Sequence, residues 1–401
     1  MNSKVTLVLP LLLILAGIAA LFAQSPVRKK VFVMKIDAEI DPRTNRYTDL
    51  ALKDATSKSA DLIILELDTY GGAVKDADDI RTRILESEIP IWAFINKDAA
   101  SAGALISIAC DSIYMAPGAS IGAATVVVAT GEAAPDKYQS YMRSIMRSTA
   151  EAKGRNPKIA EAMVDQEIAI DSITEAGKVL TFSTSEAIKY NFCEAETKSV
   201  EDILARNGIK DFELIRFELG VTERIIRFFL NPFISGLLIL IIIGGIYFEL
   251  QTPGVGFPIA AAVVAAILYF VPYYLNGLAA HWEIIVFFVG VSLLLVELFV
   301  IPGFGVAGVS GIVMMVGSLV LVMLNNDWFD FSFVKGGDIA TSLATTLSAM
   351  VLGIILLFYG GVKFTETKFF RKISLTDSQD PSKGYTAKFD QRSCQGHRGI
   401  A

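Results

Sequence analysis

The sequence predicts an α/β domain followed by an all-α membrane domain, and three observations support this prediction. Short apolar runs at residues 31–36, 62–67 and 91–95 alternate with amphipathic stretches. Of the 401 residues, 53% are hydrophobic and the mean hydropathy is +0.50, which is too apolar for an ordinary soluble enzyme of this length. The apolar residues are concentrated beyond Asn231, so the division lies between a soluble part and a spanning part.

The first 23 residues are predicted to be a signal peptide. One early lysine, Lys4, precedes an apolar stretch over residues 5–20, and the small residue Ala23 stands where cleavage would occur. An uncleaved membrane anchor remains an alternative, although the apolar stretch is short for a span. In both cases the domain that follows is exported.

The exported part, residues 24–200, alternates strands and helices as a mainly parallel sheet requires. The three apolar runs predict buried strands, and the stretches between them carry charges on one helical face only. The other expected elements are helices over 45–57 and 74–86, a helix from near Ser101, a strand over 112–115, and a helix over 135–153 that ends at Gly154.

Residues 201–231 have mixed charges and few turn signals, so they are predicted to be a connector. A membrane domain of about five spans should then occupy residues 232–362. The spans are expected at about 233–247, 257–275, 284–301, 306–324 and 343–361. Residues 363–401 form a short polar tail, and its basic first part places it in the cytoplasm by the positive-inside rule.

Two similar segments lie within the membrane part, FELQTPGVG at 248–256 and VELFVIPGFG at 296–305. Each ends one span and begins the next, so its proline and glycines predict the corner of a helical hairpin. Glu249 and Glu297 lie near these corners. A carboxylate at membrane depth can serve ion or proton transport, but here capping of a neighbouring helix is the preferred interpretation, because both lie near an interface.

The composition excludes several classes of protein. A net charge of -6, a pI near 5.2 and the lack of a basic stripe argue against nucleic-acid binding. No cofactor and no metal are predicted, because Cys110, Cys193 and Cys394 lack metal-type spacing and His281 and His397 are far apart. Cys110 and Cys193 could pair, although isolated buried thiols are the preferred interpretation.

A serine nucleophile is the candidate chemistry. Ser101 stands at a predicted helix start among small residues, which let a peptide approach and place the hydroxyl at the positive end of the helix dipole. The turn Gly71-Gly72 follows a neighbouring strand and could offer N–H groups to a developing oxyanion. With so few histidines, a lysine is the leading candidate for the base. Ser101 could instead be a simple helix cap, and the glycines an ordinary turn.

Several segments resemble a known family. DTYGG at 68–72, ASAG at 100–103 and GASIG at 118–122 resemble the Clp-protease and signal-peptide-peptidase superfamily. Together with residues 141–157 and the two hairpin segments, they resemble the long-form NfeD family of membrane-bound serine proteases over roughly residues 31–370. The resemblance implies a ClpP/crotonase-like fold and a Ser–Lys dyad peptidase of the periplasm.

The same resemblance implies the roles of individual residues. Ser101 would be the nucleophile, Lys137 the general base, and Gly71, Gly72 and Ala102 would bind the oxyanion and substrate. Lys137 should then be partly buried. Spacing alone does not distinguish it from three other lysines, Lys97, Lys153 and Lys178.

The sequence departs from the family pattern in two places. Tyr70 stands where the glycine turn usually has proline, which alters the turn but leaves both glycine N–H groups available. Long members also usually end in a cytoplasmic β-barrel of the OB type, which we expect this chain to lack, as a truncated or frameshifted product would.

The predicted function is therefore that of a membrane-anchored serine endopeptidase that cuts hydrophobic segments of membrane-associated proteins. The resemblance suggests stomatin- or prohibitin-like proteins as substrates or partners, and a homo-oligomer in the bacterial inner membrane. A non-catalytic membrane organiser that recruits stomatin-like proteins is the alternative. No nucleic-acid partner is expected.

Overall fold

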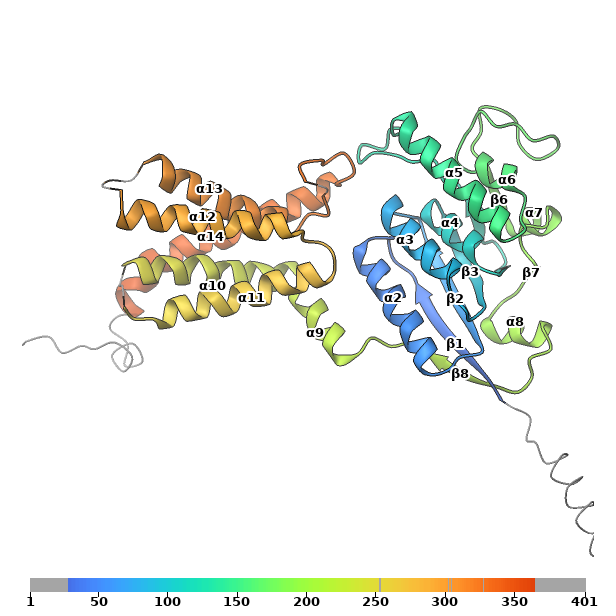
Figure 1. The fold of residues 1–401 in the computed structure, drawn as a ribbon, viewed down its shortest axis with the longest axis horizontal. Helices are drawn as coiled ribbons and strands as arrows, with labels where there is room; N and C mark the ends of the chain where they lie inside the picture. The colour runs from blue at the N-terminus through green and yellow to red at the C-terminus, as the bar shows by residue number, and fades with distance from the viewer. Residues whose placement is uncertain (1–27, 252–253, 302, 304, 327, 365–401) are drawn as a thin grey trace, which may run out of the picture. The chain divides into compact units, whose positions relative to one another are not determined.

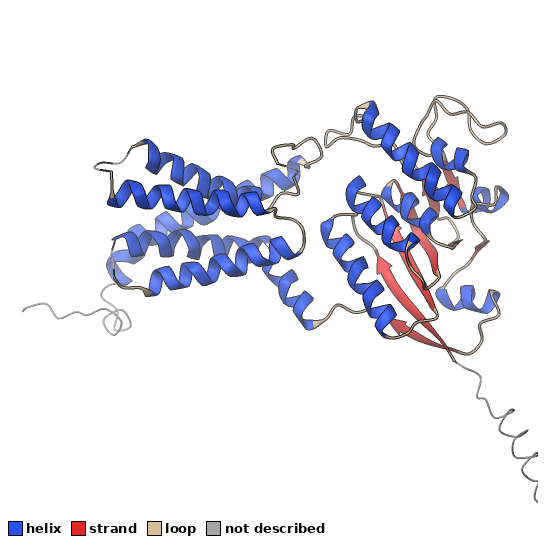
Figure 2. Cartoon of the chain, viewed as in Figure 1, coloured by secondary structure: helices blue, strands red, loops and turns tan. Residues whose placement is uncertain are grey.

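The computed structural model of the chain describes residues 28–251, 254–301, 303, 305–326 and 328–364. The predicted signal peptide, residues 1–23, and the tail from residue 365 lie outside the described residues, as does the place of any C-terminal barrel. Figures 1 and 2 show a mixed α/β domain and a set of apolar helices.

The centre of the α/β domain is an eight-stranded, mostly parallel sheet. Strands β1 (Lys29–Ile36), β2 (Leu62–Thr69) and β3 (Ile91–Ala100) lie side by side in parallel, as the three apolar runs predicted. Residues 31–34, 62–65 and 93–95 of these strands are buried, which explains why the strands read as continuous apolar runs. Strand β3 runs five residues further than predicted and ends directly before Ser101.

The long strand β3 has a different neighbour along each half. Its first half pairs with β4 (Ser112–Met115), and its last residues pair with β5 (Ser120–Gly122). Strand β5 pairs in antiparallel fashion with β6 (Thr181–Ser183), and β4 pairs with the short β7 (Ala195–Glu196). The end of β3 is therefore held between β2 and β5.

Helices cover the sheet as the amphipathic pattern predicted, with α2 and α3 over the face turned toward the viewer in Figure 1. Asp41 caps α2 by accepting from the N–H groups of Arg43 and Thr44, and Pro42 occupies the first helical position. The helices of this domain are α2 (Pro42–Ser57), α3 (Val74–Leu85), α4 (Ala102–Ala109), α5 (Asp136–Ala152), α6 (Pro157–Ala162), α7 (Thr184–Lys189) and α8 (Val200–Arg206).

Both cysteines in the described part of the chain, Cys110 and Cys193, are free and buried, which confirms the preferred interpretation. Burial raises the pKa of each thiol to about 12, so neither is a nucleophile at neutral pH.

The predicted connector differs from the structure in its first half. Residues 201–216 belong to the α/β domain, because α8 packs into its core and β8 (Phe212–Arg216) pairs in parallel with β1. An edge strand this short has only half-buried apolar positions, so its pattern was too weak to recognise.

Five apolar helices follow the amphipathic helix α9 (Val221–Phe229). They are α10 (Pro232–Gln251), α11 (Phe257–Leu275), α12 (His281–Phe299), α13 (Val306–Leu321) and α14 (Gly336–Phe364). Among the described residues, four of these are long and apolar enough to cross a membrane, and α13 is shorter. The fold therefore has four candidate spans where the sequence predicted about five.

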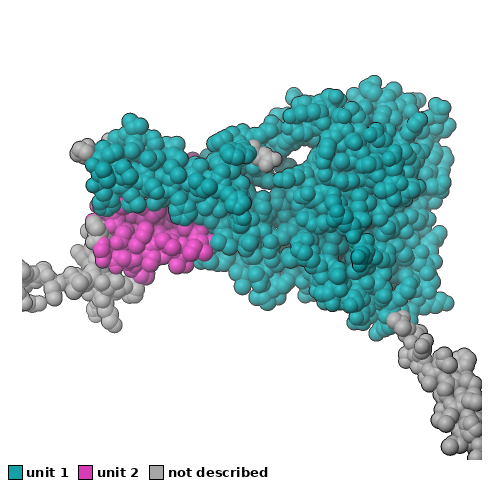
Figure 3. Space-filling model, viewed as in Figure 1, with its two compact units in different colours: residues 1–235, 268–346 teal, residues 236–267, 347–401 magenta. Residues whose placement is uncertain are grey.

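The chain divides into two compact units, residues 1–235 with 268–346 and residues 236–267 with 347–401 (Figure 3). Within the first unit, α12 and α13 approach closely through glycines. A Cβ atom on Gly290 would stand 2.8 Å from the carbonyl oxygen of Gly311, so only glycine allows this contact.

The two glutamates of the repeated segment have the same local role. Glu249 accepts hydrogen bonds from the N–H groups of Gly254 and Gly256 at 3.1–3.2 Å, and Glu297 accepts one from Gly305. Each carboxylate thus closes the turn that follows its helix. This geometry supports the capping interpretation over transport.

Candidate active site

Ser101 occupies a strained junction between a strand and a helix. Strand β3 ends at Ala100, α4 begins at Ala102, and Ser101 between them has φ 54° and ψ -116°. Left-handed backbone is costly for a residue with a Cβ atom and is concentrated at functional sites. A hydrogen bond from the Ser101 N–H to the carbonyl of Gly122, at 2.9 Å, holds the residue in this conformation.

The predicted glycine turn lies directly against the serine. A Cβ atom on Gly71 would stand 2.6 Å from the Ser101 Cβ and 3.0 Å from its hydroxyl oxygen, and one on Gly72 would stand 2.1 Å from the Ile40 carbonyl oxygen. Gly103, in the first turn of α4, is similarly close to Thr69. The small residues noted in the sequence are therefore those that let the end of β2 meet the start of α4.

The backbone N–H groups around the hydroxyl are not equally available. The Gly71 N–H donates to the Thr69 hydroxyl at 3.1 Å, and the Ser101 N–H donates to the Gly122 carbonyl. Ile40 pairs with this turn through two hydrogen bonds: its N–H donates to the Gly71 carbonyl, and its carbonyl accepts from the Ala73 N–H. Neither bond uses the N–H of Gly72, which is exposed. Ala102 is the first residue of α4, where N–H groups have no intrahelical partner. Gly72 and Ala102 are thus the candidate donors.

Arg155 supports the helix that follows the serine, and sequence reasoning gave it no role. Its side chain is 6% exposed and donates to the carbonyls of Ile108 and Cys110, at 3.0 and 2.9 Å, at the C-terminal end of α4. Its guanidinium lies 3.8 Å from the carboxylate of Glu194. A cation at the C-terminal end of a helix interacts favourably with the helix dipole. The partners are mostly main-chain atoms, which leave no pattern in the sequence.

Among the residues that the structure describes, Lys137 makes no hydrogen bond with the serine. It stands in the first turn of α5, its side chain is exposed, and its Nζ lies 4.6 Å from the ring centroid of Tyr138. Within the described residues, no hydrogen bond joins the Ser101 hydroxyl to Lys137 or to any other side chain. The partial burial expected for Lys137 is therefore not present in this structure.

The three alternative lysines are each engaged by a carboxylate. Lys97 pairs with Asp68 at 3.2 Å, Lys153 with Asp111 at 2.6 Å, and Lys178 with Glu175 at 2.9 Å. By contrast, no ion pair involves Lys137 in the part of the chain that is described. Of the four candidates, only Lys137 has an amine that need not break a salt bridge to act as a base.

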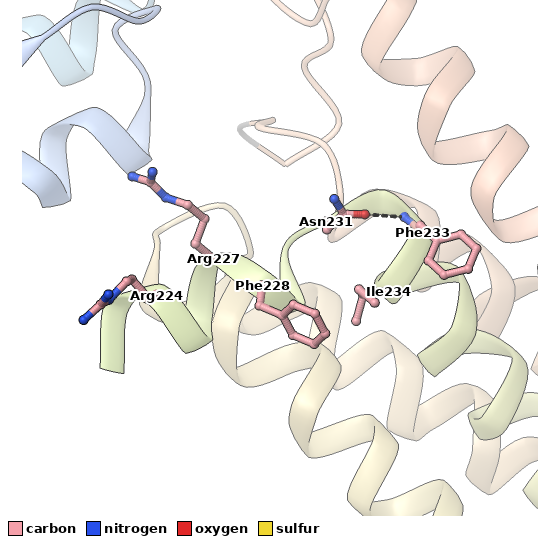
Figure 4. A pocket seen from close by; sticks show the side chains of 6 residues that line it. All are labelled: Arg224, Arg227, Phe228, Asn231, Phe233 and Ile234. Carbon is pink, nitrogen blue, oxygen red and sulfur yellow. Dashed lines mark hydrogen bonds between the residues drawn. The ribbon is translucent and has the colours of Figure 1, made fainter. Parts of the chain in front are cut away.

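A pocket of about 550 Å³ lies elsewhere, where α9 meets α10 (Figure 4). It is lined by Arg224, Arg227, Phe228, Asn231, Phe233 and Ile234. None of these is a predicted site residue, so the pocket is separate from the candidate active site.

Comparison with known proteins assigns the family. The model of the NfeD1b N-terminal domain matches residues 30–217, and that of the NfeD integral membrane domain matches residues 233–362. The membrane protein NfeD1b of Bacillus subtilis (strain 168) is 33% identical over 377 residues, which cover 93% of this chain and 82% of the relative. The chain belongs to the NfeD1b family. It is an integral membrane protein with an α/β domain followed by a helical domain, which confirms the predicted family and the predicted order of an α/β and an all-α domain.

More distant relatives are proteases. The membrane-bound protease PH1510 of Pyrococcus horikoshii is 27% identical over 282 residues, which cover 64% of this chain and 61% of that protein. A solved structure of a membrane-bound stomatin-specific protease, a lysine-to-alanine variant in complex with a substrate peptide, is 27% identical and covers 50% of this chain and 98% of its own, with a TM-score of 0.44. That homologous protease binds a substrate peptide and is specific for a stomatin homologue.

Proposed function

We propose that this NfeD1b protein is a membrane-anchored serine endopeptidase in which Ser101 is the nucleophile and Lys137 the general base. The observation that carries the proposal is the strained conformation of Ser101, with φ 54° at the start of α4 and a glycine turn in contact with its side chain. A strained strand-to-helix turn is a recurrent way to expose a nucleophilic serine. The 27% identity with an archaeal membrane-bound protease supports the same reaction.

In the proposed reaction, the neutral Lys137 amine takes the proton of the Ser101 hydroxyl, whose oxygen attacks the peptide carbonyl carbon. The N–H groups of Gly72 and Ala102 receive the negative charge on the carbonyl oxygen. Lys137 then gives its proton to the departing amine, and water releases the acyl group from Ser101. Gly71 contributes by leaving room for the hydroxyl.

This reaction requires Lys137 to approach Ser101 to roughly 3 Å. Lys137 follows a loop over residues 123–135 that joins β5 to α5. The Gln139 side chain fixes Val126 of this loop. It accepts a hydrogen bond from the Val126 N–H at 3.1 Å and donates one to the Val126 carbonyl at 2.6 Å. The N–H groups of Ala124 and Ala129 also donate to the carbonyls of Met163 and Ser332, so closure of the loop over a bound peptide would exchange these hydrogen bonds. Lys137 itself is exposed and has no ion pair to break among the described residues.

The proposed substrate is an extended apolar segment of a membrane-associated protein of the stomatin or prohibitin type. Tyr70, in the turn beside Ser101, is 82% exposed and offers an aromatic surface to such a segment. The stomatin specificity of the homologous protease supports the class of substrate.

We place the α/β domain, residues 24 to about 216, outside the cytoplasm and the C-terminus inside it, in a homo-oligomer of the inner membrane. This orientation requires an odd number of crossings, so in this proposal the shorter apolar helix α13 crosses the bilayer together with the four candidate spans. The basic residues that begin the tail support this orientation. A C-terminal reporter should therefore be shielded from a membrane-impermeant reagent added to the outside. Reaction of the reporter in intact cells would reverse the assignment.

Peptide cleavage by the full chain in detergent tests the proposal. A quenched fluorescent apolar peptide should be cut by the native protein, and Ser101→Ala and Lys137→Ala should each reduce the rate to background. Lys97→Ala is the matched control, since it also removes an exposed lysine near the site. If Lys137→Ala cleaves as fast as Lys97→Ala, Lys137 is not the base.

A non-catalytic organiser is the second candidate, and one observation favours it. Lys137 makes no contact with Ser101, so in this conformation no base serves the hydroxyl. If the protein is an organiser, the Ser101→Ala variant should bind a stomatin-like partner in pull-downs as strongly as the native chain does. The native chain should then cut neither that partner nor the peptide.

A further inference from the structure

Helix α9 carries an exposed apolar stripe. Val221, Ile225 and Phe228 recur at i, i+4 and i+7, which places them on one face of the helix. Their side chains are 65%, 53% and 57% exposed, while Ile226 on another face is buried. Three neighbouring exposed apolar side chains form a surface of the kind that contacts a membrane or another protein.

Two arginines flank the stripe without a partner. Arg224 and Arg227 are exposed, and neither forms an ion pair or hydrogen bond with any residue that the structure describes. The acidic residue of the same helix, Glu223, is already engaged by Arg46 at 2.7 Å. The surface beside the stripe is therefore positively charged and suited to an anion.

The helix is tied to the beginning of the first candidate span. Helix α9 ends at Phe229 and α10 begins at Pro232. Asn231 accepts from the Phe233 N–H at 2.9 Å, and the Ser235 hydroxyl donates to the Phe229 carbonyl at 3.2 Å. Figure 4 shows this junction, with Phe228, Phe233 and Ile234 on the apolar side of the pocket and both guanidinium groups extending away from them.

We propose that α9 lies in the headgroup region of the bilayer that α10 crosses, and that Arg224 and Arg227 bind the phosphate of an anionic phospholipid whose acyl chain packs against Phe228 and Phe233. Guanidinium groups pair well with phosphate oxygens. An exposed apolar face beside arginines is typical of helices that lie in a membrane interface. Continuity with the span selects lipid over a soluble partner, because the first turn of α10 already enters the bilayer, where Phe233 is 79% exposed.

Native mass spectrometry of the detergent-solubilised full chain tests this site. With phosphatidylglycerol and phosphatidylcholine supplied equally, the native chain should retain phosphatidylglycerol preferentially. The double variant Arg224→Ala/Arg227→Ala should lower its retention about tenfold. Lys189→Ala/Arg206→Ala is the control, since it removes two exposed cations of the α/β domain and should leave lipid binding unchanged.

Two results would overturn the proposal. Equal loss of phosphatidylglycerol in both double variants would mean that total charge, not this site, retains the lipid. The same spectra report the subunit number, so a second variant, Ile225→Ser/Phe228→Ser, separates lipid from protein as the occupant. If this variant changes the subunit number but not lipid retention, the stripe is a contact between copies of the chain.

Discussion

Gly71 contacts Ser101 so closely that a Cβ atom on the glycine would stand 3.0 Å from the serine hydroxyl oxygen. The two residues end neighbouring elements, since Gly71 follows β2 and Ser101 follows β3. The contact means that the turn cannot change without moving the nucleophile.

Gly71→Ala should therefore reduce peptide cleavage by about 100-fold, because a displacement of the hydroxyl by a fraction of an ångström to an ångström misaligns the attack. Gly118→Ala is the matched control. Gly118 also has a positive φ, 79°, but nothing lies within 4 Å of its Cβ position. Both variants should lose about 1 kcal/mol of stability from backbone strain. Gly71→Ala should lose more than this, because its Cβ would stand 2.6 Å from the Ser101 Cβ. Equal activity of the two variants would show that the close contact has no catalytic importance.

The backbone of Ser101 predicts an unusual order of stabilities. Glycine normally lowers stability relative to alanine, but at φ 54° it relieves strain that alanine keeps. Ser101→Gly should therefore unfold with a free energy about 1 kcal/mol higher than that of Ser101→Ala, while neither variant cleaves peptide. Denaturant titration of the two proteins gives the difference. A less stable glycine variant would show that Ser101 is not strained.

Arg155 should be important for stability because three main-chain carbonyls and Glu194 depend on its guanidinium. Arg155→Met should cost about 3 kcal/mol, since it takes this donor from the buried carbonyls of Ile108 and Cys110. Arg147→Met provides the comparison. Arg147 forms a more exposed pair with Glu161, so its loss should cost less than about 1 kcal/mol. Similar losses in both variants would contradict the role assigned to Arg155.

Asp76 should make stability depend on pH. Burial in the first turn of α3 raises the pKa of Asp76 from its usual 3.8 to about 6, although a hydrogen bond from Asn45 opposes this. The folded state then binds the proton more tightly than the unfolded state. The contribution of Asp76 to stability is therefore highest below pH 4, falls between pH 4 and 6, and stays reduced above pH 6.

Asp76→Asn removes this cost while keeping an oxygen for Asn45. The variant should gain up to about 3 kcal/mol over the native protein at pH 7.5 and far less at pH 4.5. Asp79→Asn, on the same helix but exposed, should show no such difference. Denaturation at the two pH values measures both. An equal gain at both pH values would rule out titration of Asp76 as the cause.

The sequence was sufficient for those parts of the molecule that local chemistry determines. Buried parallel strands read as apolar runs, and the small residues around Ser101 were visible before any geometry was known. The close contact of Gly71 with Ser101 was not predicted: the sequence indicated both turn glycines as N–H donors, whereas the Gly71 N–H is bonded to the Thr69 hydroxyl. Strand β8 was missed because a short, half-buried edge strand has little apolar pattern. The position of Lys137 could not be predicted, because it depends on an irregular loop whose course no periodicity specifies.

Labelling with a fluorophosphonate in native membranes tests the central claim most directly, because the reagent reacts with a serine only when a base activates it. The account predicts that the full chain is labelled on Ser101, that Lys137→Ala removes the label, and that Lys97→Ala retains it. Failure of the native chain to react, or equal labelling of the Lys137→Ala variant, would contradict the proposed pairing of Ser101 with Lys137.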